Sequence, residues 1–241
     1  MTITLPELRQ LEEDGFQSLP CVFSASQVDA MISGLESALA SSQNGAIRSE
    51  AGTLYAARNV LALWPEAARV WRVSPLDEIL RATLGHELGL VRALFFDKPP
   101  GQSWALPWHK DLTVAVRDNR LPSPNFSKPT RKAGVPHVEA PRGVLEAMLT
   151  ARIHLDEVTE ENGPLKVIPG SHRTGKLLQL GVIQPRTLLA GRGDVLLIRP
   201  LVAHCSNPSQ DHTRRHRRVL HLEFAAREKL PDGYAWHDFV R

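Results

Sequence analysis

The 241-residue sequence predicts a mainly β protein whose helices flank the core at its N-terminal end. Apolar residues recur at helical spacing within about residues 1–88. Short strand-like runs, separated by turns that contain proline or glycine, follow from about residue 89 to residue 226. The length and the 42% hydrophobic content suit one domain with a substantial core, so residues 1–241 are expected to form a single domain.

Three segments of the N-terminal part have the periodicity of amphipathic helices. They are a first segment that ends at Asp14-Gly15, residues 27–40 and residues 74–84. Ser24 or Ser26 can cap the second of these helices. Pro75 falls in the first turn of the third, and Gly85 lies just past its end. The polar stretch 41–49 is expected to be a loop.

Six runs have the composition of strands. They are residues 16–23, 90–96, 148–155, 165–168, 195–198 and 217–224. The longest irregular stretch is 119–141, which contains five prolines. A loop of this length in a compact domain is usually functional or disordered, so residues 119–141 are expected to form a lid over a substrate site.

The triplet His109-Lys110-Asp111 is the first candidate for chemistry. In a strand, His109 and Asp111 point to the same side and can present an imidazole and a carboxylate to one metal ion. The alternative is a surface pair in a turn. His204 follows the apolar run 195–198, at the point where a core strand would leave its sheet. Two histidines and one carboxylate form the facial triad of non-haem Fe(II) oxygenases, which leaves coordination positions for a 2-oxo acid and dioxygen.

A 2-oxo acid with a second carboxylate also needs a cationic partner inside the protein. Arg217, thirteen residues after His204, opens a strand-like run, and a guanidinium can bind a carboxylate through two hydrogen bonds. Arg217 and Arg218 face opposite sides of that strand. Alternation alone favours Arg218, because its face also carries the apolar residues at 220, 222 and 224.

The sequence resembles the phytanoyl-CoA dioxygenase (PhyH-like) family of Fe(II)/2-oxoglutarate oxygenases over nearly the whole chain. The matching pieces are PWHKDLT at 107–113, ENGPLKVIPGSH at 161–172, HCS at 204–206 and RRVLHLEF at 217–224. The resemblance implies a double-stranded β-helix (jelly-roll, cupin-like) core. It also implies that Fe(II), 2-oxoglutarate and dioxygen take part in the reaction, with release of succinate and carbon dioxide.

Residue by residue, the resemblance implies a role for five side chains. His109, Asp111 and His204 would be the iron ligands, Arg217 would bind the far carboxylate of 2-oxoglutarate, and Ser206 would help to bind the same molecule. Hydroxylation of a small organic molecule is the expected reaction. Halogenating relatives lack the carboxylate ligand, so the presence of Asp111 argues against halogenation.

Three further residues are candidates for contact with the substrate. Arg152 either lines the pocket or lies on a solvated face. His137, within the expected lid, is a candidate contact with the substrate. The alternative is that it is an exposed histidine on the surface. Lys110 replaces the glutamine that many relatives have between the first two ligands; it should face away from the metal but can alter contacts to cosubstrate or substrate. His172 is interpreted as a structural residue at a turn.

Other classes of protein are less well supported by the sequence. The basic cluster 213–218 lacks the interleaved aromatic residues and fold motif of a nucleic-acid site. No apolar run approaches the length of a membrane span, and the N-terminus lacks the pattern of a signal peptide, so a cytoplasmic location is expected. A small-molecule substrate is expected, and no obligate protein partner is indicated. The main alternative is a catalytically inactive metal-binding protein on the same fold.

Overall fold

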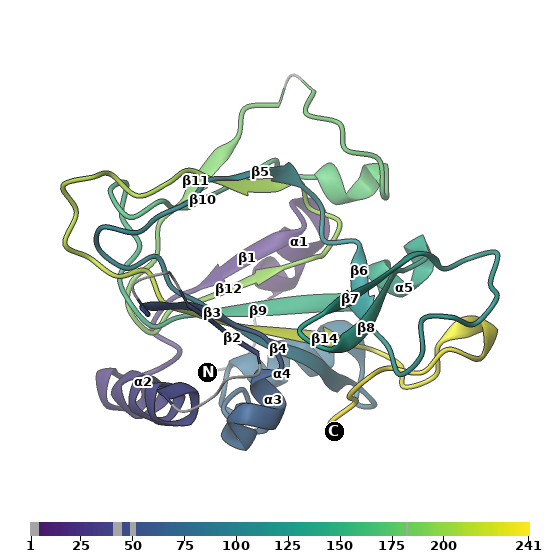
Figure 1. Ribbon diagram of the computed structural model, residues 1–241. Helices are drawn as coiled ribbons and strands as arrows, with labels where there is room; N and C mark the ends of the chain where they lie inside the picture. Colours follow the sequence, from purple (N-terminus) through teal and green to yellow (C-terminus); the bar gives the residue numbers. More distant parts are fainter. Residues whose placement is uncertain (1–4, 41–44, 49–51, 182) are drawn as a thin grey trace.

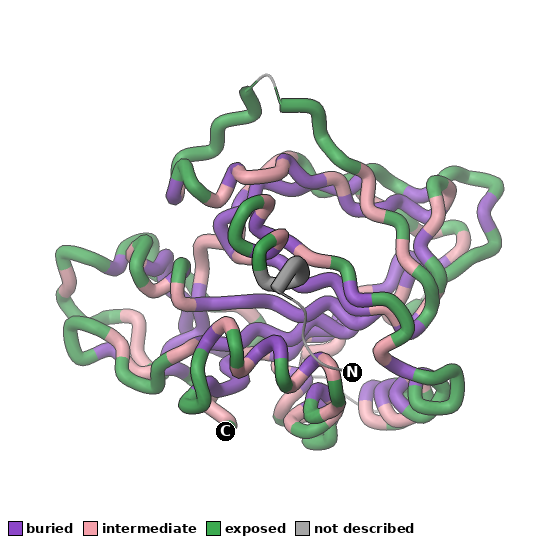
Figure 2. Tube along the Cα trace, turned by 180° about the vertical axis from the view of Figure 1, so that it is seen from behind, coloured by how far each residue is buried: buried purple, intermediate pink, exposed green. Residues whose placement is uncertain are grey.

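The fold consists of two facing antiparallel sheets, a smaller three-stranded sheet at one end, and helices outside the larger sheet (Figure 1). The computed structural model describes residues 5–40, 45–48, 52–181 and 183–241. Figure 2 shows that the strands of the sheets are mostly buried and that the long connections are exposed. Within the described residues, no helix is both long and apolar enough to cross a lipid bilayer.

The larger sheet contains seven strands in the order β1-β12-β9-β14-β4-β3-β2. Their bounds are β1 Phe16–Leu19, β2 Ala46–Arg48, β3 Leu54–Ala57, β4 Gly89–Phe96, β9 Met148–His154, β12 Val195–Ile198 and β14 Val219–Ala225. The apolar runs predicted most of these strands to within one or two residues. Four details differ from the predictions: Ala46–Arg48 form a strand where a loop was expected, Leu54–Ala57 form a strand that was not predicted, β1 ends at Leu19 rather than at residue 23, and β14 begins two residues after Arg217. Positions 41–44 and 49 of that expected loop lie outside the described residues.

The smaller facing sheet has the order β11-β10-β13-β5. Its strands are β5 Leu106–His109, β10 Leu165–Val167, β11 Arg186–Leu188 and β13 His204–Ser206. Figure 1 shows this sheet above the larger one, with its strands running over the strands that form the floor. Residues of both layers line a cavity that contains the candidate site.

The third sheet corrects the expectation of an irregular stretch at 119–141. It has the order β6-β8-β7, with β6 Thr113–Ala115, β7 Ser127–Lys132 and β8 Val135–Glu139. β7 and β8 form an antiparallel hairpin, joined by Ala133 and Gly134, which both have positive φ angles. The five side chains of β7 before Lys132 are exposed, so this edge strand lacks the alternating apolar pattern by which strands are recognised in sequence.

The helices lie mainly on the outer face of the larger sheet (Figure 1). They are α1 Leu5–Glu13, α2 Ala25–Ala40, α3 Val60–Leu63, α4 Leu76–Leu84 and α5 Arg142–Glu146, with 3-10 turns at Pro65–Ala68, Ser171–Thr174 and Pro231–Gly233. The three longer helices match the predicted ones, whereas α3 and α5 are too short to have shown a period. α4 begins one residue after Pro75 and ends before Gly85, whose φ of 88° suits glycine.

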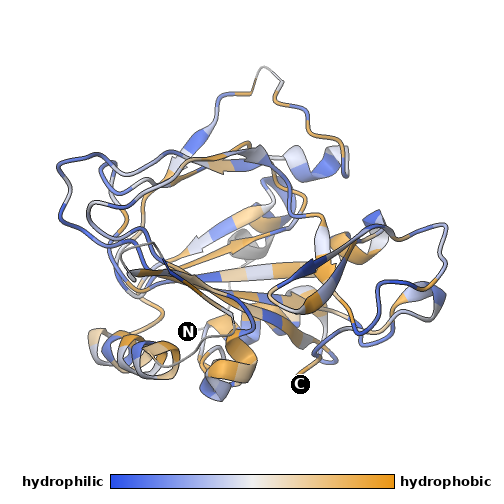
Figure 3. Cartoon of the chain, in the orientation of Figure 1, coloured by the Kyte–Doolittle hydropathy of each residue, from blue (hydrophilic) through white to orange (hydrophobic). Residues whose placement is uncertain are grey.

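Hydrophobic packing between the helices and the outer face of the sheet provides the main core. Leu220, Leu222 and Phe224 of β14 are fully buried there, and the rings of Trp71 and Phe224 meet edge-on with centroids 5.1 Å apart. Figure 3 shows hydrophobic colouring along these strands and in the helices below them. The opposite, inner face of β14 carries His221 and Glu223. The apolar side of this sheet therefore faces the helices, and its polar side faces the space between the sheets.

Candidate active site

Three metal-binding side chains come together on the smaller sheet. His109 is the last residue of β5, Asp111 follows two residues later, and His204 opens β13 directly opposite His109 in the antiparallel register. Ligand atoms of all three lie within 4.8 Å of one another. Nε2 of His109 is 3.7 Å from Oδ1 of Asp111, and Nε2 of His204 is 3.6 Å from Oδ2 of the same carboxylate. The alternative of an unrelated surface pair does not fit this arrangement.

The orientation of both imidazoles suits metal binding. Nδ1 of His109 lies 2.8 Å from the carbonyl oxygen of Pro107, and Nδ1 of His204 lies 2.9 Å from that of Val202. Because a carbonyl only accepts hydrogen bonds, Nδ1 carries the proton in each ring and Nε2 keeps its lone pair. Both lone pairs point toward the carboxylate of Asp111. Two neutral imidazoles and one carboxylate on one side of a cavity fit an Fe(II) ion with open positions.

The electrostatic surroundings keep His204 and Asp111 in the protonation states that a metal requires. Burial lowers the pKa of His204 to about 4, so the imidazole is neutral near pH 7. Burial opposes ionisation of Asp111, but the nearby imidazoles of His204, His221 and His109 outweigh this effect and lower its pKa to about 2. Asp111 is therefore a carboxylate at any pH at which the fold is expected to be intact.

A cavity of about 500 Å³ opens beside the three ligand candidates. Its volume is within the range of roughly 300–1,000 Å³ that is usual for small-molecule sites. The apolar part of its wall consists of Ile47, Tyr55, Ala56, Leu94, Phe96, Trp104, Leu106 and Leu165. Its charged residues besides Asp111 are Arg58, Arg92, Lys132, Arg152, Arg217 and Glu223. A second cavity, of about 430 Å³ beside Trp236, contains none of the candidate ligands.

Arg217 lies inside this cavity. Its side chain is buried, Nη1 donates a hydrogen bond to the carbonyl oxygen of Gly163 at 2.9 Å, and Nε has no partner among the described residues. Burial, reinforced by repulsion from Arg152, lowers the pKa of Arg217 to about 9. A buried guanidinium with unused donors fits an anionic ligand, because burying a charge without a partner is costly.

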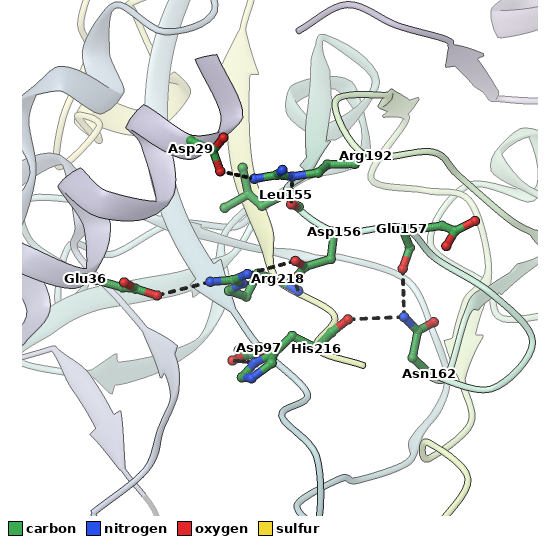
Figure 4. Close-up of polar contacts among 10 residues, drawn as sticks. All are labelled: Asp29, Glu36, Asp97, Leu155, Asp156, Glu157, Asn162, Arg192, His216 and Arg218. Atoms are coloured by element: carbon green, nitrogen blue, oxygen red, sulfur yellow. Dashed lines mark hydrogen bonds and ion pairs between the residues drawn. The ribbon is translucent and has the colours of Figure 1, made fainter. Parts of the chain in front are cut away.

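Arg218 points to the other side of the sheet, contrary to what alternation alone favoured. It forms an ion pair with Asp156 at 2.9 Å and another with Glu36 at 3.1 Å (Figure 4). Alternation misled because the apolar face of β14 is covered by helices, whereas its other face carries His221 and Glu223 and lines the cavity. The choice of Arg217 that followed from the resemblance agrees with the position of its side chain.

Ser206 and a lysine that the sequence analysis missed lie next to Arg217. Ser206 is buried on β13, and its Oγ accepts a hydrogen bond from Nζ of Lys98 at 3.1 Å. Lys98 has no exposed surface; it also donates to the carbonyl oxygen of Asn207 at 2.6 Å. Burial, with repulsion from Arg217 and Arg152, lowers its pKa to about 7. The only signal in the sequence was its place two residues after the strand 90–96.

Arg152 lines the cavity and joins a chain of polar contacts across three strands. Its Nη1 donates to Nδ1 of His221 at 3.1 Å, and Nε2 of His221 donates to Oε1 of Glu223 at 3.1 Å. Glu223 is in turn paired with Arg92, whose Nε lies 2.9 Å from Oε2. These residues are opposite one another in the register of β9, β14 and β4. Nε of Arg152 has no partner among the described residues and is free to bind a ligand.

The other two substrate-contact candidates lie elsewhere. Lys110 points away from the triad and donates to the carbonyl oxygens of Ser171 and Gly175 at 2.7 and 2.6 Å. His137 is buried rather than exposed, with Nδ1 3.0 Å from the carbonyl oxygen of Val135, and burial lowers its pKa to about 4. Neither is among the described residues that line the cavity. Their polar atoms contact backbone carbonyls of neighbouring segments instead.

Several solved structures share this architecture. EctD from S. alaskensis with bound Fe aligns with a TM-score of 0.71 and 21% identity over 92% of this chain and 76% of that one. HygX from Streptomyces hygroscopicus with nickel and 2-oxoglutarate bound aligns with a TM-score of 0.63 and 18% identity over 99% and 98% of the two chains. SnoN, a non-heme alpha ketoglutarate dependent epimerase from nogalamycin biosynthesis, aligns with a TM-score of 0.65 and 19% identity over 95% and 83%. At these identities the likeness establishes the fold.

The sheets and these neighbours define the fold as a cupin-like double-stranded β-helix, which confirms the predicted fold class, and the triad is a candidate metal site within it. The family model "Phytanoyl-CoA dioxygenase (PhyH)" matches residues 11–217, and the chain belongs to that family. Among curated proteins, none matches the sequence. A dioxygenase-type function and the expectation of Fe(II) and 2-oxoglutarate follow from the family, the triad and neighbours determined with these molecules.

Proposed function

We propose that the protein is a non-haem Fe(II)- and 2-oxoglutarate-dependent dioxygenase that hydroxylates a small organic molecule and releases succinate and carbon dioxide. The proposal rests chiefly on one observation: Nε2 of His109, Nε2 of His204 and the carboxylate of Asp111 converge beside a cavity. When bound there, Fe(II) would supply coordination positions for 2-oxoglutarate and dioxygen and would activate the dioxygen that oxidises both 2-oxoglutarate and the substrate. The protein's own residues position the reactants.

The two imidazoles are held before any metal binds. The hydrogen bonds from Nδ1 of His109 and His204 to backbone carbonyls fix both the tautomer and the plane of each ring. The backbone N–H of Asp111 donates to the carbonyl oxygen of Pro200 at 2.9 Å and fixes the carboxylate's backbone in the same way. Such a site loses little conformational entropy when it takes up a metal ion.

The far carboxylate of 2-oxoglutarate would be bound by Arg217 and Ser206. Arg217 offers unused N–H donors inside the cavity, and the hydroxyl of Ser206 lies on the strand that begins with the ligand His204. Lys98 supports this arrangement, because its hydrogen bond to Oγ of Ser206 leaves the hydroxyl proton of Ser206 available to an anion. Arg217 would supply two parallel N–H donors, which fit a carboxylate.

Hydroxylation is favoured over two other outcomes. The carboxylate of Asp111 occupies the position that a halide would need, which argues against halogenation. SnoN shows that an epimerase can share this architecture. The products of hydroxylation and epimerisation differ in composition, because hydroxylation adds one oxygen atom to the substrate and epimerisation adds none. Mass spectrometry of the product therefore distinguishes them.

Anaerobic addition of Fe(II) and then 2-oxoglutarate to the metal-free protein tests the proposal. A weak visible charge-transfer band should appear only when both are present, because it requires 2-oxoglutarate to coordinate the iron. Asp111→Ala should abolish the band. Asp118→Ala is a matched control: it removes a carboxylate that is half exposed and pairs with Arg120 away from the cavity, and it should leave the band intact.

The same experiment separates the active enzyme from its main alternative. If folded wild-type protein binds Fe(II) but gives no band with 2-oxoglutarate, the protein is a metal-binding protein without this activity. If the band forms, release of succinate in air provides a readout with which to search for substrates. A band that persists in Asp111→Ala would show that the carboxylate is not a ligand.

A further inference from the structure

A second group of cations lines the cavity apart from Arg217. Arg58 directly follows β3, and Lys132 is the last residue of β7, so the two come from segments far apart in the sequence. Both are half-buried and both contribute to the cavity wall. The side chain of Arg58 forms no hydrogen bond or ion pair with any residue that the structure describes. Nζ of Lys132 donates to Oγ1 of Thr113 at 3.1 Å and has two further protons to donate.

These cations are held close to one another without a counter-charge of their own. Burial lowers the pKa of Lys132, and repulsion from Arg92 and Arg58 lowers it further. Burial and repulsion from Arg92 likewise lower the pKa of Arg58. The carboxylate of Glu223 attracts both cations, but its oxygens are already paired with Arg92 and His221. Like charges gathered in a half-buried site destabilise the empty protein unless an anion binds there.

The net charge of the whole cavity also indicates that an anion binds there. Five cationic side chains and two carboxylates line it, which is an excess of three positive charges. A divalent iron ion and the dianion of 2-oxoglutarate cancel each other, so filling the proposed metal and cosubstrate sites leaves the excess unchanged. The excess of positive charge in the cavity is therefore available to a molecule that is neither metal nor cosubstrate.

We propose that the substrate is an organic anion, a carboxylic acid or a phosphate monoester, whose acidic group binds Arg58 and Lys132. This inference rests on the proposed oxygenase function and adds the substrate class to it. Arg58 provides two N–H donors in one plane and Lys132 a point charge, a combination that fits either kind of oxyanion.

The body of the substrate is apolar or aromatic. Tyr55 and Trp104 stand together in the cavity wall with ring centroids 5.3 Å apart, and Phe96 and Leu94 line it from β4. An apolar group packed against these side chains would share the cavity with the acidic group at Arg58 and the metal site at His109. The acid would thus fix the end of the molecule that does not react, and the apolar wall would exclude water from the end that does.

Matched probes of equal shape test the inference without knowledge of the natural substrate. Protein loaded anaerobically with Fe(II) and saturating 2-oxoglutarate is titrated by calorimetry with 3-phenylpropionate and with its uncharged amide, 3-phenylpropanamide. The acid should bind at least about ten-fold more tightly, because it gains charge-assisted hydrogen bonds that the amide lacks. Benzyl phosphate, titrated in parallel, tells which acidic group the subsite prefers: tighter binding than the acid identifies a phosphate site, and weaker binding a carboxylate site.

Two double variants with the same loss of charge separate direct contact from the general field of the protein. Arg58→Gln/Lys132→Gln should abolish the preference for the acid over the amide. Arg69→Gln/Arg131→Gln removes two exposed arginines that do not line the cavity, one of them next to Lys132 on β7, and should keep the preference. Equal binding of acid and amide to wild type, failure of the acid to bind, or a preference that survives in the first variant would overturn the inference.

The charge-transfer band distinguishes failure of this inference from failure of the proposed function. If the band forms in wild type and in both double variants but no anion preference exists, the oxygenase assignment stands and only the substrate class is wrong. If the band does not form in wild type, the oxygenase assignment itself has failed, and the substrate class fails with it. If the band is lost only in Arg58→Gln/Lys132→Gln, these residues bind 2-oxoglutarate and the inference is overturned.

Discussion

Arg217 and Arg218 are neighbours in the chain, yet their guanidinium groups lie on opposite sides of the seven-stranded sheet. Arg217 donates to the carbonyl oxygen of Gly163 inside the cavity, whereas Arg218 is paired with Asp156 and Glu36 outside. The two residues have the same chemistry and differ in what surrounds them. They are therefore a natural pair for separating ligand binding from stability.

Arg217→Met should weaken binding of 2-oxoglutarate by roughly 2–5 kcal/mol, because the far carboxylate loses its buried partner. Arg218→Met should leave that affinity unchanged and lower the free energy of unfolding by about 1–3 kcal/mol, since Asp156 loses its main partner. Calorimetric titration of 2-oxoglutarate into Mn(II)-loaded protein and urea denaturation measure the two effects. Equal losses of affinity in both variants would contradict the assignment of Arg217.

The ion pair between Arg92 and Glu223 should behave as a buried pair. Both side chains are largely inaccessible, and Nε of Arg92 lies 2.9 Å from Oε2 of Glu223. Glu223→Leu should cost roughly 3–5 kcal/mol of stability, because it leaves a buried guanidinium without a counter-charge. Arg92→Met/Glu223→Leu should recover part of that loss. A double variant less stable than Glu223→Leu in urea denaturation would show that the pair does not act as a unit.

Stability should fall at mildly acidic pH, and His154 should contribute to this fall. His154 is buried with Nδ1 unpaired, and burial, reinforced by Arg152 and Arg217, lowers its pKa from 6.5 to about 3. Between these two values the unfolded chain binds a proton that the folded chain does not. The free energy of unfolding should thus be at its full value above the unfolded pKa and decrease as the pH falls toward the folded one, by up to about 1.4 kcal/mol per pH unit for one such group.

His154→Gln removes this proton linkage and should flatten the pH dependence of the metal-free protein. Urea denaturation of wild type and variant across the same pH window measures the difference between the two slopes. His86→Gln is a suitable comparison, because that ring is exposed in the turn that follows α4. Identical slopes for wild type and His154→Gln would mean that His154 does not contribute.

Phe224→Ala should destabilise the fold without altering the chemistry. Phe224 is fully buried between β14 and the helices and meets the ring of Trp71 edge-on. Its loss should cost about 3–5 kcal/mol in thermal or urea denaturation, as for other large aromatic residues in cores. The charge-transfer band should persist at temperatures at which the variant is folded. A cost below about 1 kcal/mol would mean that the helical layer contributes little to the core.

The sequence predicted those strands whose apolar pattern is set by burial. Residues 195–198 were assigned correctly as a strand, because four successive apolar residues there pack against both layers. β7 was missed because its side chains are polar and Pro129 lies within it. An edge strand tolerates proline and needs only its partner β8 to be held in place. Hydrogen-bonded pairing between strands that are distant in the sequence cannot be recognised from the local pattern of apolar and polar residues.

The candidate site was predictable where its residues lie close together in the chain. His109 and Asp111 are two residues apart in one extended segment. Their spacing therefore predicts that both side chains point to the same side. Lys98 was missed because a completely buried lysine is rare and local sequence does not indicate it. Arg58 and Lys132 meet only because β3 and β7 end beside the same cavity.

The metal ligands belong to the smaller sheet, and Arg217 precedes β14 of the larger one. A 2-oxoglutarate molecule held at one end by the metal and at the other by Arg217 would therefore cross-link the two layers through their interior. Part of its binding free energy would resist their separation, since a ligand that binds only the folded state stabilises it. Slower amide hydrogen exchange along β13 and β14 in the loaded protein would be the signature of this coupling. The bound cosubstrate would then stabilise the core in the same way as a buried side chain, but reversibly.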